Sequence, residues 1–323
     1  MLRLSIIAPA DLTSRIVDAL EDDEAVSALL VQRGAAVKPP GDLITCDLAR
    51  EGANEVIDFL REWRVHERGT VHIEHSSTWM SRAGFEAERR TPGSSADAVV
   101  WADVTQRAYD ESEFNWTYVS FMTLATLIAS VAIVLDSQVL IIGAMVLGPE
   151  FVPVAAIGLS VVRRRWNLLQ QAVSTLFGGF LVAIVLTALI TLLGRSWGWI
   201  TVEDLVVRPD TAFVYTPDRW SFVVAVIAGA AGVLSLTSAK VGGLAGVFIS
   251  VTTVPAAGNI ALGIAFGLPE EIWGSTQQLF LNIAGMAIAG WVTLTVQQVV
   301  WHPLSVRRAR FIARRGRADR PVD

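Results

Sequence analysis

Six stretches of this chain are apolar over about 20 residues each, the length that an α-helix needs to cross the hydrocarbon core of a membrane. They cover roughly residues 116–135, 138–162, 166–193, 220–238, 241–266 and 276–300. Because a bilayer offers no water to backbone N–H and C=O groups, such stretches fold as helices whose hydrogen bonds are internal. The sequence therefore predicts a six-span α-helical membrane protein.

The composition separates an acidic soluble part from an apolar part. Of the 323 residues, 52% are hydrophobic and 18% are charged, where a soluble protein has about a quarter. Residues 1–113 carry 12 Lys+Arg against 21 Asp+Glu, and residues 114–323 carry 14 against 10. Cys46 is the single cysteine, which excludes an intrachain disulfide and a thiolate metal cluster. No metal, cofactor or nucleic-acid partner is expected.

Basic residues beside the spans predict the orientation, because Lys and Arg collect on the cytoplasmic side. With six alternating spans, the basic positions and the N-terminal domain fall on one side, and the acidic loop 194–219 falls on the other. Both termini are therefore expected in the cytoplasm, with the chain in the cell (cytoplasmic) membrane. The basic positions are Arg163, Arg164, Arg165, Lys240 and the arginine-rich tail 302–323. That tail is either a lipid contact for anionic headgroups or a plain orientation signal.

Glu150 lies within the second apolar run, after Gly148 and Pro149. A carboxylate at the bilayer midplane costs several kcal/mol unless it is protonated, paired or hydrated. Proline removes a backbone donor and breaks a helix, and broken helices occur at membrane depth where they line a cavity. The pattern predicts a polar site at this break.

Spans one to three resemble spans four to six. The pattern W-x3-Q-Q-x6-G begins at Trp166 and again at Trp273, and Pro153 lies 102 positions before Pro255. On that offset Glu150 corresponds to Thr252, and Gly148 to Ser250. Two copies of three spans cross the membrane in opposite directions, so a 3+3 inverted repeat with broken second and fifth helices is expected, with the site at the interface of the halves.

The predicted site combines residues of both broken helices. Glu150 is expected to serve as a proton or cation site, and the fifth span supplies hydroxyl and amide groups. The alternative for the small residues of these helices is close helix packing. The candidate binding residues are Gly148, Pro149, Glu150, Ser250, Thr252, Thr253 and Asn259.

Residues 1–80 alternate strand and helix patterns in the order βαββαβ, which suggests a ferredoxin-like α+β sandwich. Strands are expected at 2–8, 25–37, 42–48 and 70–74, with a turn at 38–41. Helices are expected at 11–19, capped by Asp11, and around 56–63. His72 and His75 are three apart on a strand and so point to opposite faces, which disfavours a metal site.

Residues 81–114 are expected to form a linker and a juxtamembrane helix that Ser94 and Asp97 cap. The predicted organisation then has four parts: the cytoplasmic domain 1–80, the linker and helix 81–114, the six-span domain 115–301, and the basic tail 302–323.

The stretch from Val139 to Pro153, with Ile-Gly-Ala-Met followed by the Pro-x3-Pro pair, resembles the signature of the "domain of unknown function 389" family of bacterial and archaeal membrane proteins. The segment from Leu244 to Gly263 is similar to the second conserved stretch of that family. The resemblance covers roughly residues 115–265 and implies an integral membrane protein with a cytoplasmic appendage. It implies no activity.

Two classes of function fit these patterns. The first is a transporter or channel for a small solute or ion, regulated or assembled by the cytoplasmic domain. The second is a non-transporting scaffold or sensor whose soluble domain binds a ligand or partner. A homo-oligomer is expected in either case. An enzyme is disfavoured, since the chain lacks His-Glu-x-x-His, Gly-x-Ser-x-Gly and Walker patterns.

Overall fold

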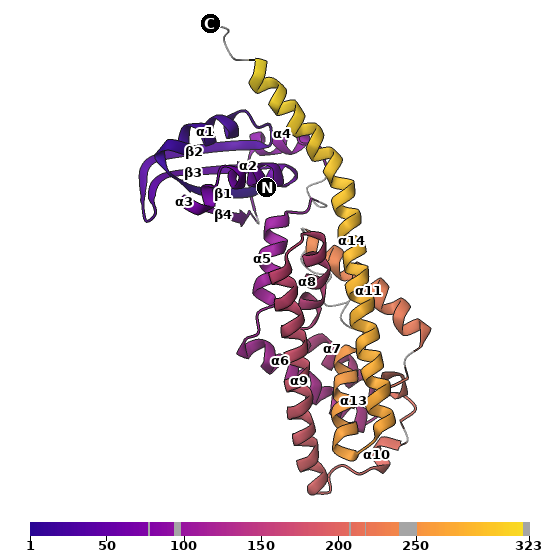
Figure 1. Ribbon diagram of the computed structural model, residues 1–323. Coiled ribbons are helices and arrows are strands. Elements are labelled where there is room, and N and C mark those ends of the chain that lie inside the picture. The colour runs from indigo at the N-terminus through magenta and orange to yellow at the C-terminus, as the bar shows by residue number, and fades with distance from the viewer. Residues whose placement is uncertain (77, 94–97, 207, 217, 239–250, 319–323) are drawn as a thin grey trace. The chain divides into compact units, whose positions relative to one another are not determined.

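The computed structural model describes residues 1–323 except 77, 94–97, 207, 217, 239–250 and 319–323, and describes residues 206 and 300–318 by their backbone alone (Figure 1). The chain divides into two compact units. The first begins with Met1–Val104, and the second contains Thr105–Leu236.

The first unit is built on a four-stranded antiparallel sheet with the order β2-β3-β1-β4 (Figure 1). Its strands are β1 (Leu2–Ala8), β2 (Val26–Val37), β3 (Pro40–Leu48) and β4 (Thr70–His75). Its helices are α1 (Ala10–Glu21), η1 (Arg50–Gly52), α2 (Ala53–Glu62), α3 (Val65–Arg68) and α4 (Arg82–Arg90), followed by α5 (Trp101–Glu111).

One face of the sheet carries the core of the first unit. Leu2, Leu4 and Ile6 alternate along β1 and are fully buried, as expected for a strand with one face covered. The same cluster contains Ile16 of α1 and Leu60 of α2. Burying each such side chain contributes about 1.5–3 kcal/mol, so both helices are held to the sheet by apolar packing.

The order of strands and helices over residues 1–75 is the predicted one, with two local corrections. Asp11 does not cap α1, which begins at Ala10 after Pro9. Asp11 instead accepts two hydrogen bonds from Arg68, at 2.9 and 2.8 Å. The predicted turn is also shorter, because Pro40 and Gly41 pair with Val37 and Ala36 as the start of β3.

The segment predicted as a linker contains α4, and the helix after it begins later than predicted. Ser94 and Asp97 lie outside the described residues, and Ala98–Val100 are not helical. Asn54 of α2 accepts a hydrogen bond from the backbone N–H of Trp101 at 3.1 Å and donates to Val99 O at 2.7 Å. A residue distant in sequence therefore satisfies the start of α5, which a local capping pattern cannot predict.

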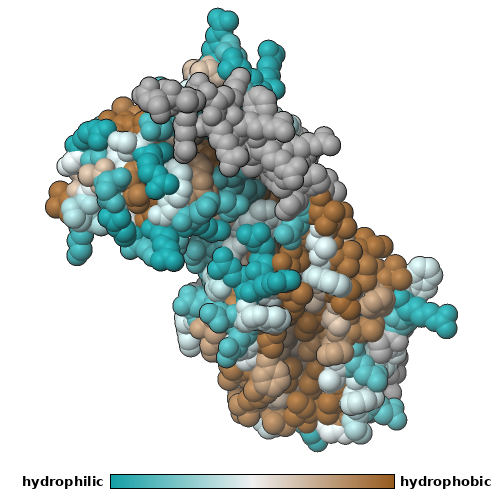
Figure 2. Space-filling view, turned by 45° about the horizontal axis from the view of Figure 1, so that its top comes forward, coloured by the Kyte–Doolittle hydropathy of each residue, from teal (hydrophilic) through white to brown (hydrophobic). Residues whose placement is uncertain are grey.

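The second unit consists of apolar helices. They are α6 (Trp116–Val134), α7 (Gln138–Leu147), α8 (Phe151–Val162), α9 (Trp166–Ser196), α10 (Glu203–Val206), η2 (Ala212–Val214), α11 (Arg219–Thr237), α13 (Thr253–Phe266) and the first part of α14 (Pro269–Ala318), whose residues from Gln297 onward belong to the first unit. Apolar side chains cover much of their outer surface (Figure 2). Such helices indicate a membrane protein.

Six spans are not confirmed by the described residues. Four helices, α6, α9, α11 and the first part of α14, are long and apolar enough to cross a membrane, and α7 with α8 makes a fifth if that bent pair counts as one span. Residues 241–250 of the predicted fifth span lie outside the described residues, and α13 has 14 residues. Helix α14 begins at Pro269, so Glu270 and Glu271 belong to its first turn and not to a loop, and its backbone continues through the predicted tail to Ala318.

Cys46 is buried in β3, and burial raises the pKa of its thiol to about 12. A raised pKa leaves almost no reactive thiolate at neutral pH. We expect the native protein to resist maleimide labelling at pH 7.5 and to become labelled on unfolding, as counted by mass spectrometry. A cysteine at exposed Ala35 in a Cys46→Ser chain is the matched control and should react at once; rapid reaction of native Cys46 would contradict its burial.

Candidate functional site

The predicted break is present between α7 and α8, whose axes differ by 52°. Pro149 cannot donate a backbone hydrogen bond, and Gly148 is the last position before the bend. A Cβ on Gly148 would lie 2.3 Å from Glu150 Oε2 and 2.6 Å from Val254 Cγ2. Only glycine fits here, because the start of α13 approaches the break closely.

Glu150 joins the beginnings of two short helices. It precedes the first residue of α8, and its Oε1 accepts a hydrogen bond of 2.5 Å from the hydroxyl of Thr253, the first residue of α13. Glu150 is 6% exposed. Its second oxygen, Oε2, is buried with no hydrogen-bond partner among the described residues. The carboxylate thus lies where two helix N-termini meet, and one of its two oxygens accepts no hydrogen bond from the described residues.

Thr252, immediately before α13, is held by two amides of α14. Gln278 Nε2 and Asn282 Nδ2 donate to Thr252 Oγ1 at 3.0 and 3.1 Å. Both amide side chains are almost fully buried. Gln278 and Asn282 are four apart and so share one face of α14. In the sequence Gln278 marked only the repeat, and Asn282 was not predicted as a site residue. Two polar residues four positions apart inside an apolar span are the sequence pattern from which both could have been predicted.

A cavity of about 380 Å³ in the second unit reaches Thr252. Its lining combines apolar residues of α7 and α11 with polar side chains. The polar lining residues are Gln138, Asp218, Ser221, Thr252, Gln278 and Asn282. Pockets of this size accommodate small ligands, and this one ends one residue away from the Thr253–Glu150 contact.

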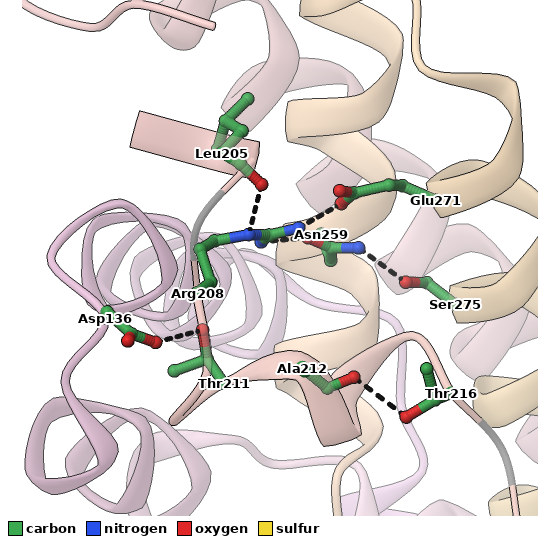
Figure 3. Close-up of polar contacts among 9 residues, drawn as sticks. All are labelled: Asp136, Leu205, Arg208, Thr211, Ala212, Thr216, Asn259, Glu271 and Ser275. Atoms are coloured by element: carbon green, nitrogen blue, oxygen red, sulfur yellow. Dashed lines mark hydrogen bonds and ion pairs between the residues drawn. The ribbon is translucent and has the colours of Figure 1, made fainter. Parts of the chain in front are cut away.

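Asn259, predicted as a site residue, belongs to a different cluster. It lies about two helical turns beyond Thr252 along α13. Its Oδ1 accepts from Arg208 Nη1 at 2.9 Å, and its Nδ2 donates to Ser275 Oγ at 2.8 Å (Figure 3). Ser250 lies outside the described residues. The structure therefore brings together Gly148, Pro149, Glu150, Thr252 and Thr253, and places Asn259 apart from them.

Arg208 is a buried charge that the sequence analysis assigned to an ordinary loop. Its guanidinium donates to Leu205 O at 2.7 Å and forms an ion pair with Glu271 in the first turn of α14 (Figure 3). Its side chain is 1% exposed and that of Glu271 is 14% exposed. Together with Asn259, this arrangement fastens the 205–216 loop to the middle of α13 and to the start of α14.

The same loop is tied to the turn between α6 and α7. Thr211 Oγ1 donates to Asp136 Oδ1 at 2.8 Å, and the backbone N–H of Asp210 donates to Asp136 Oδ2 at 3.2 Å. Gln138 Nε2 donates back to Asp210 O at 3.0 Å. Asp136 adopts a positive φ of 46°, a conformation that short polar residues tolerate best. The loop therefore bridges the turn between α6 and α7 and the helices α13 and α14.

Tyr118 is a second residue near Glu150 that sequence reasoning missed. Its ring occupies space left by Gly179 of α9, where a Cβ would come within 2.5 Å of the ring. Its hydroxyl is buried without a hydrogen-bond partner among the described residues and interacts electrostatically with Glu150. An unpaired buried hydroxyl is uncommon in native proteins, so this position is a candidate ligand contact.

Within the described residues, no group of three or more His, Cys, Asp or Glu side chains is placed to hold a metal ion. His72 and His75 lie on β4, opposite Ser5 and Leu2 of β1. His75 Nε2 lies 3.8 Å from Asp103 Oδ2. The candidate site is therefore the break itself, built from one carboxylate, hydroxyls and amides.

Comparison with known proteins agrees with the resemblance seen in the sequence. Residues 145–288 match the model of the family described as "Domain of unknown function (DUF389)". An uncharacterized protein of Methanocaldococcus jannaschii is 22% identical over 257 residues, which cover 79% of this chain and 77% of that protein. No solved structure matches. The family match includes both the break and the residues of α13 and α14 that face it.

Because the Arg208–Glu271 pair is buried, we expect a single variant to lose much more stability than the double variant. Arg208→Met leaves Glu271 buried without its partner and should lower stability by about 3–5 kcal/mol, whereas adding Glu271→Leu should recover most of that loss. Thermal unfolding in detergent measures both effects. A single variant as stable as wild type would show that the pair does not hold the loop.

The cavity predicts that water-soluble reagents reach Thr252. In a Cys46→Ser chain in liposomes, Thr252→Cys should react with a membrane-impermeant maleimide, because hydrated thiols ionise. Phe280→Cys, which replaces a largely exposed apolar side chain on α14, should not react, because a thiol facing lipid stays protonated. Equal protection of both cysteines would mean that the cavity is closed to water.

Proposed function

From the membership of residues 145–288 in the DUF389 family and the geometry of the break, we propose that this protein is a transporter or channel for a small solute or ion. The observation that carries the proposal is the cavity that ends at Thr252, next to the hydrogen bond between Thr253 and Glu150. A cavity that carries polar groups beside a broken helix is an arrangement that transporters use to hold their cargo.

We also propose the six-span inverted repeat as the architecture of the second unit. In support, α8 and α13 begin 102 positions apart, and each has a proline as its third residue, Pro153 and Pro255. Each short helix also packs on the first helix of the other half. A Cβ on Gly232 of α11 would meet the ring of Phe151, and one on Gly258 would come within 3.0 Å of Ser130 N on α6.

In this proposal both termini lie in the cytoplasm, on the side of the arginines that follow α8. The N-terminal unit is a ferredoxin-like sandwich, in support of which its sheet has the order β2-β3-β1-β4. It regulates or assembles a homo-oligomer in the cell membrane, and the basic tail contacts anionic lipid headgroups. The site carries no reaction, since a single carboxylate bonded to a threonine lacks the paired groups of acid–base or nucleophilic catalysis.

The alternative is a scaffold or sensor that transports nothing. A groove of about 430 Å³ in the N-terminal unit favours it, because this groove is lined by charged and aromatic groups suited to a ligand. Those groups include Arg3, Asp47, Glu74, His75 and Trp79. Under this alternative, the unit would bind its ligand with equal affinity whether or not Glu150 is intact, and reconstituted protein would carry no flux.

Proton flux through liposomes tests the transport function. With an internal pH-sensitive dye and a potassium diffusion potential, wild-type protein should move protons faster than protein-free liposomes do. Glu150→Gln should lower the flux to that background, because an amide cannot carry the proton. Glu203→Gln, which removes an exposed acid of α10, should leave it unchanged. Wild-type flux equal to background, or full flux in Glu150→Gln, would refute proton transport through Glu150.

A further inference from the structure

We propose that the cargo site is an anion site, which a small monovalent anion occupies in exchange for the carboxylate of Glu150. This inference rests on the proposed function and names the ligand class of the same site. It also departs from the sequence-based expectation of a cation at Glu150. Charge, hydrogen-bond donors and access each support it.

The partial positive charges of the two helix N-termini at the break favour the binding of one negative charge. Helices α8 and α13 both begin there, with 12 and 14 residues. Each helix N-terminus carries roughly half a positive elementary charge, and the two together balance one monovalent anion. No ion pair between described residues includes Glu150, so its carboxylate is the anion that now fills this position. A cation bound at the same place would face both positive helix ends.

The groups around the carboxylate are donors. The Thr253 hydroxyl donates to Glu150 Oε1, and the Tyr118 hydroxyl is buried, unpaired among described residues, and within electrostatic reach of Glu150. Helix N-termini add backbone N–H groups that have no partner inside the helix. The carboxylate uses one of its oxygens and leaves Oε2 unpaired. A small anion can accept from the hydroxyls and the N–H groups together.

The cavity gives an anion a route to this position. Its lining includes Thr252, the residue before the donor Thr253. The acid at its rim, Asp218, accepts hydrogen bonds from the backbone N–H and the hydroxyl of Ser221 at 2.7 and 2.8 Å. The Asp218 carboxylate thus caps the start of α11. The amides of Gln278 and Asn282 hold Thr252 in place as neutral groups, and Asp218 is the only acid among the described residues of the lining.

The exchange predicts that removing the carboxylate creates a vacant anion site. In detergent at constant ionic strength, Glu150→Gln and Glu150→Ala should each be stabilised by chloride or nitrate relative to gluconate, with a rise in Tm that grows with anion concentration. Wild type should show no such difference. Adding Tyr118→Phe or Thr253→Val to Glu150→Gln should weaken the apparent affinity about tenfold, the effect of losing one charge-assisted hydrogen bond.

Chloride efflux from liposomes completes the test, and Glu150→Ala should release chloride about tenfold faster than wild type. Chloride-specific stabilisation without faster efflux would uphold the anion site and refute transport. If neither Glu150 variant is stabilised by chloride or nitrate, the anion proposal is overturned, whatever the proton flux of wild type. Stabilisation of these variants by sodium over a bulky organic cation, at fixed chloride, would overturn it equally and identify a cation site.

Discussion

The contact between Glu150 and Thr253 organises the apolar unit of this protein, because it joins the break between α7 and α8 to the start of α13. Glu150 is the residue before α8, and its buried carboxylate accepts a hydrogen bond from the hydroxyl of Thr253, the first residue of α13. Gly148 permits the close approach, since any side chain there would collide with Glu150 and Val254. The position, charge and accessibility of the candidate site all follow from this meeting of helix ends.

A second constraint holds the middle of α13. The ion pair of Arg208 with Glu271, and the hydrogen bonds of both Arg208 and Ser275 to Asn259, fasten the 205–216 loop to α13 and α14. Asp136 ties the same loop to the turn before α7. The short helix is therefore fixed at two points, by the Glu150 carboxylate at its first residue and by the Arg208 guanidinium at Asn259 in its middle. A rigid half-helix keeps the donors at the break in one geometry, which a selective ion site requires.

Local patterns predicted much of the first unit but not its connections. The alternating burial in β1 and the apolar faces of α1 and α2 follow from hydrophobic periodicity along the chain, so the order of these elements was predictable. Asp11 pairs with Arg68 and Asn54 holds the start of α5 across 47 residues. At α1 this pairing takes the place of the predicted cap, whereas Ser94 and Asp97, the predicted caps of the next helix, lie outside the described residues. A capping pattern describes what a side chain can reach along the chain, and it does not include partners that folding brings near.

The sequence by itself determined that this chain has helices long and apolar enough to span a membrane, that one apolar run breaks at Gly148–Glu150, and that Glu150 lies within that run. Those conclusions need only the length of apolar runs and the chemistry of proline, glycine and glutamate in lipid. Tertiary structure alone decided the partners: Thr253 rather than Thr252 faces Glu150, Asn259 binds Arg208, and Tyr118 approaches from α6. Side-chain partners depend on how helices rotate and pack against one another, and no local pattern encodes that rotation.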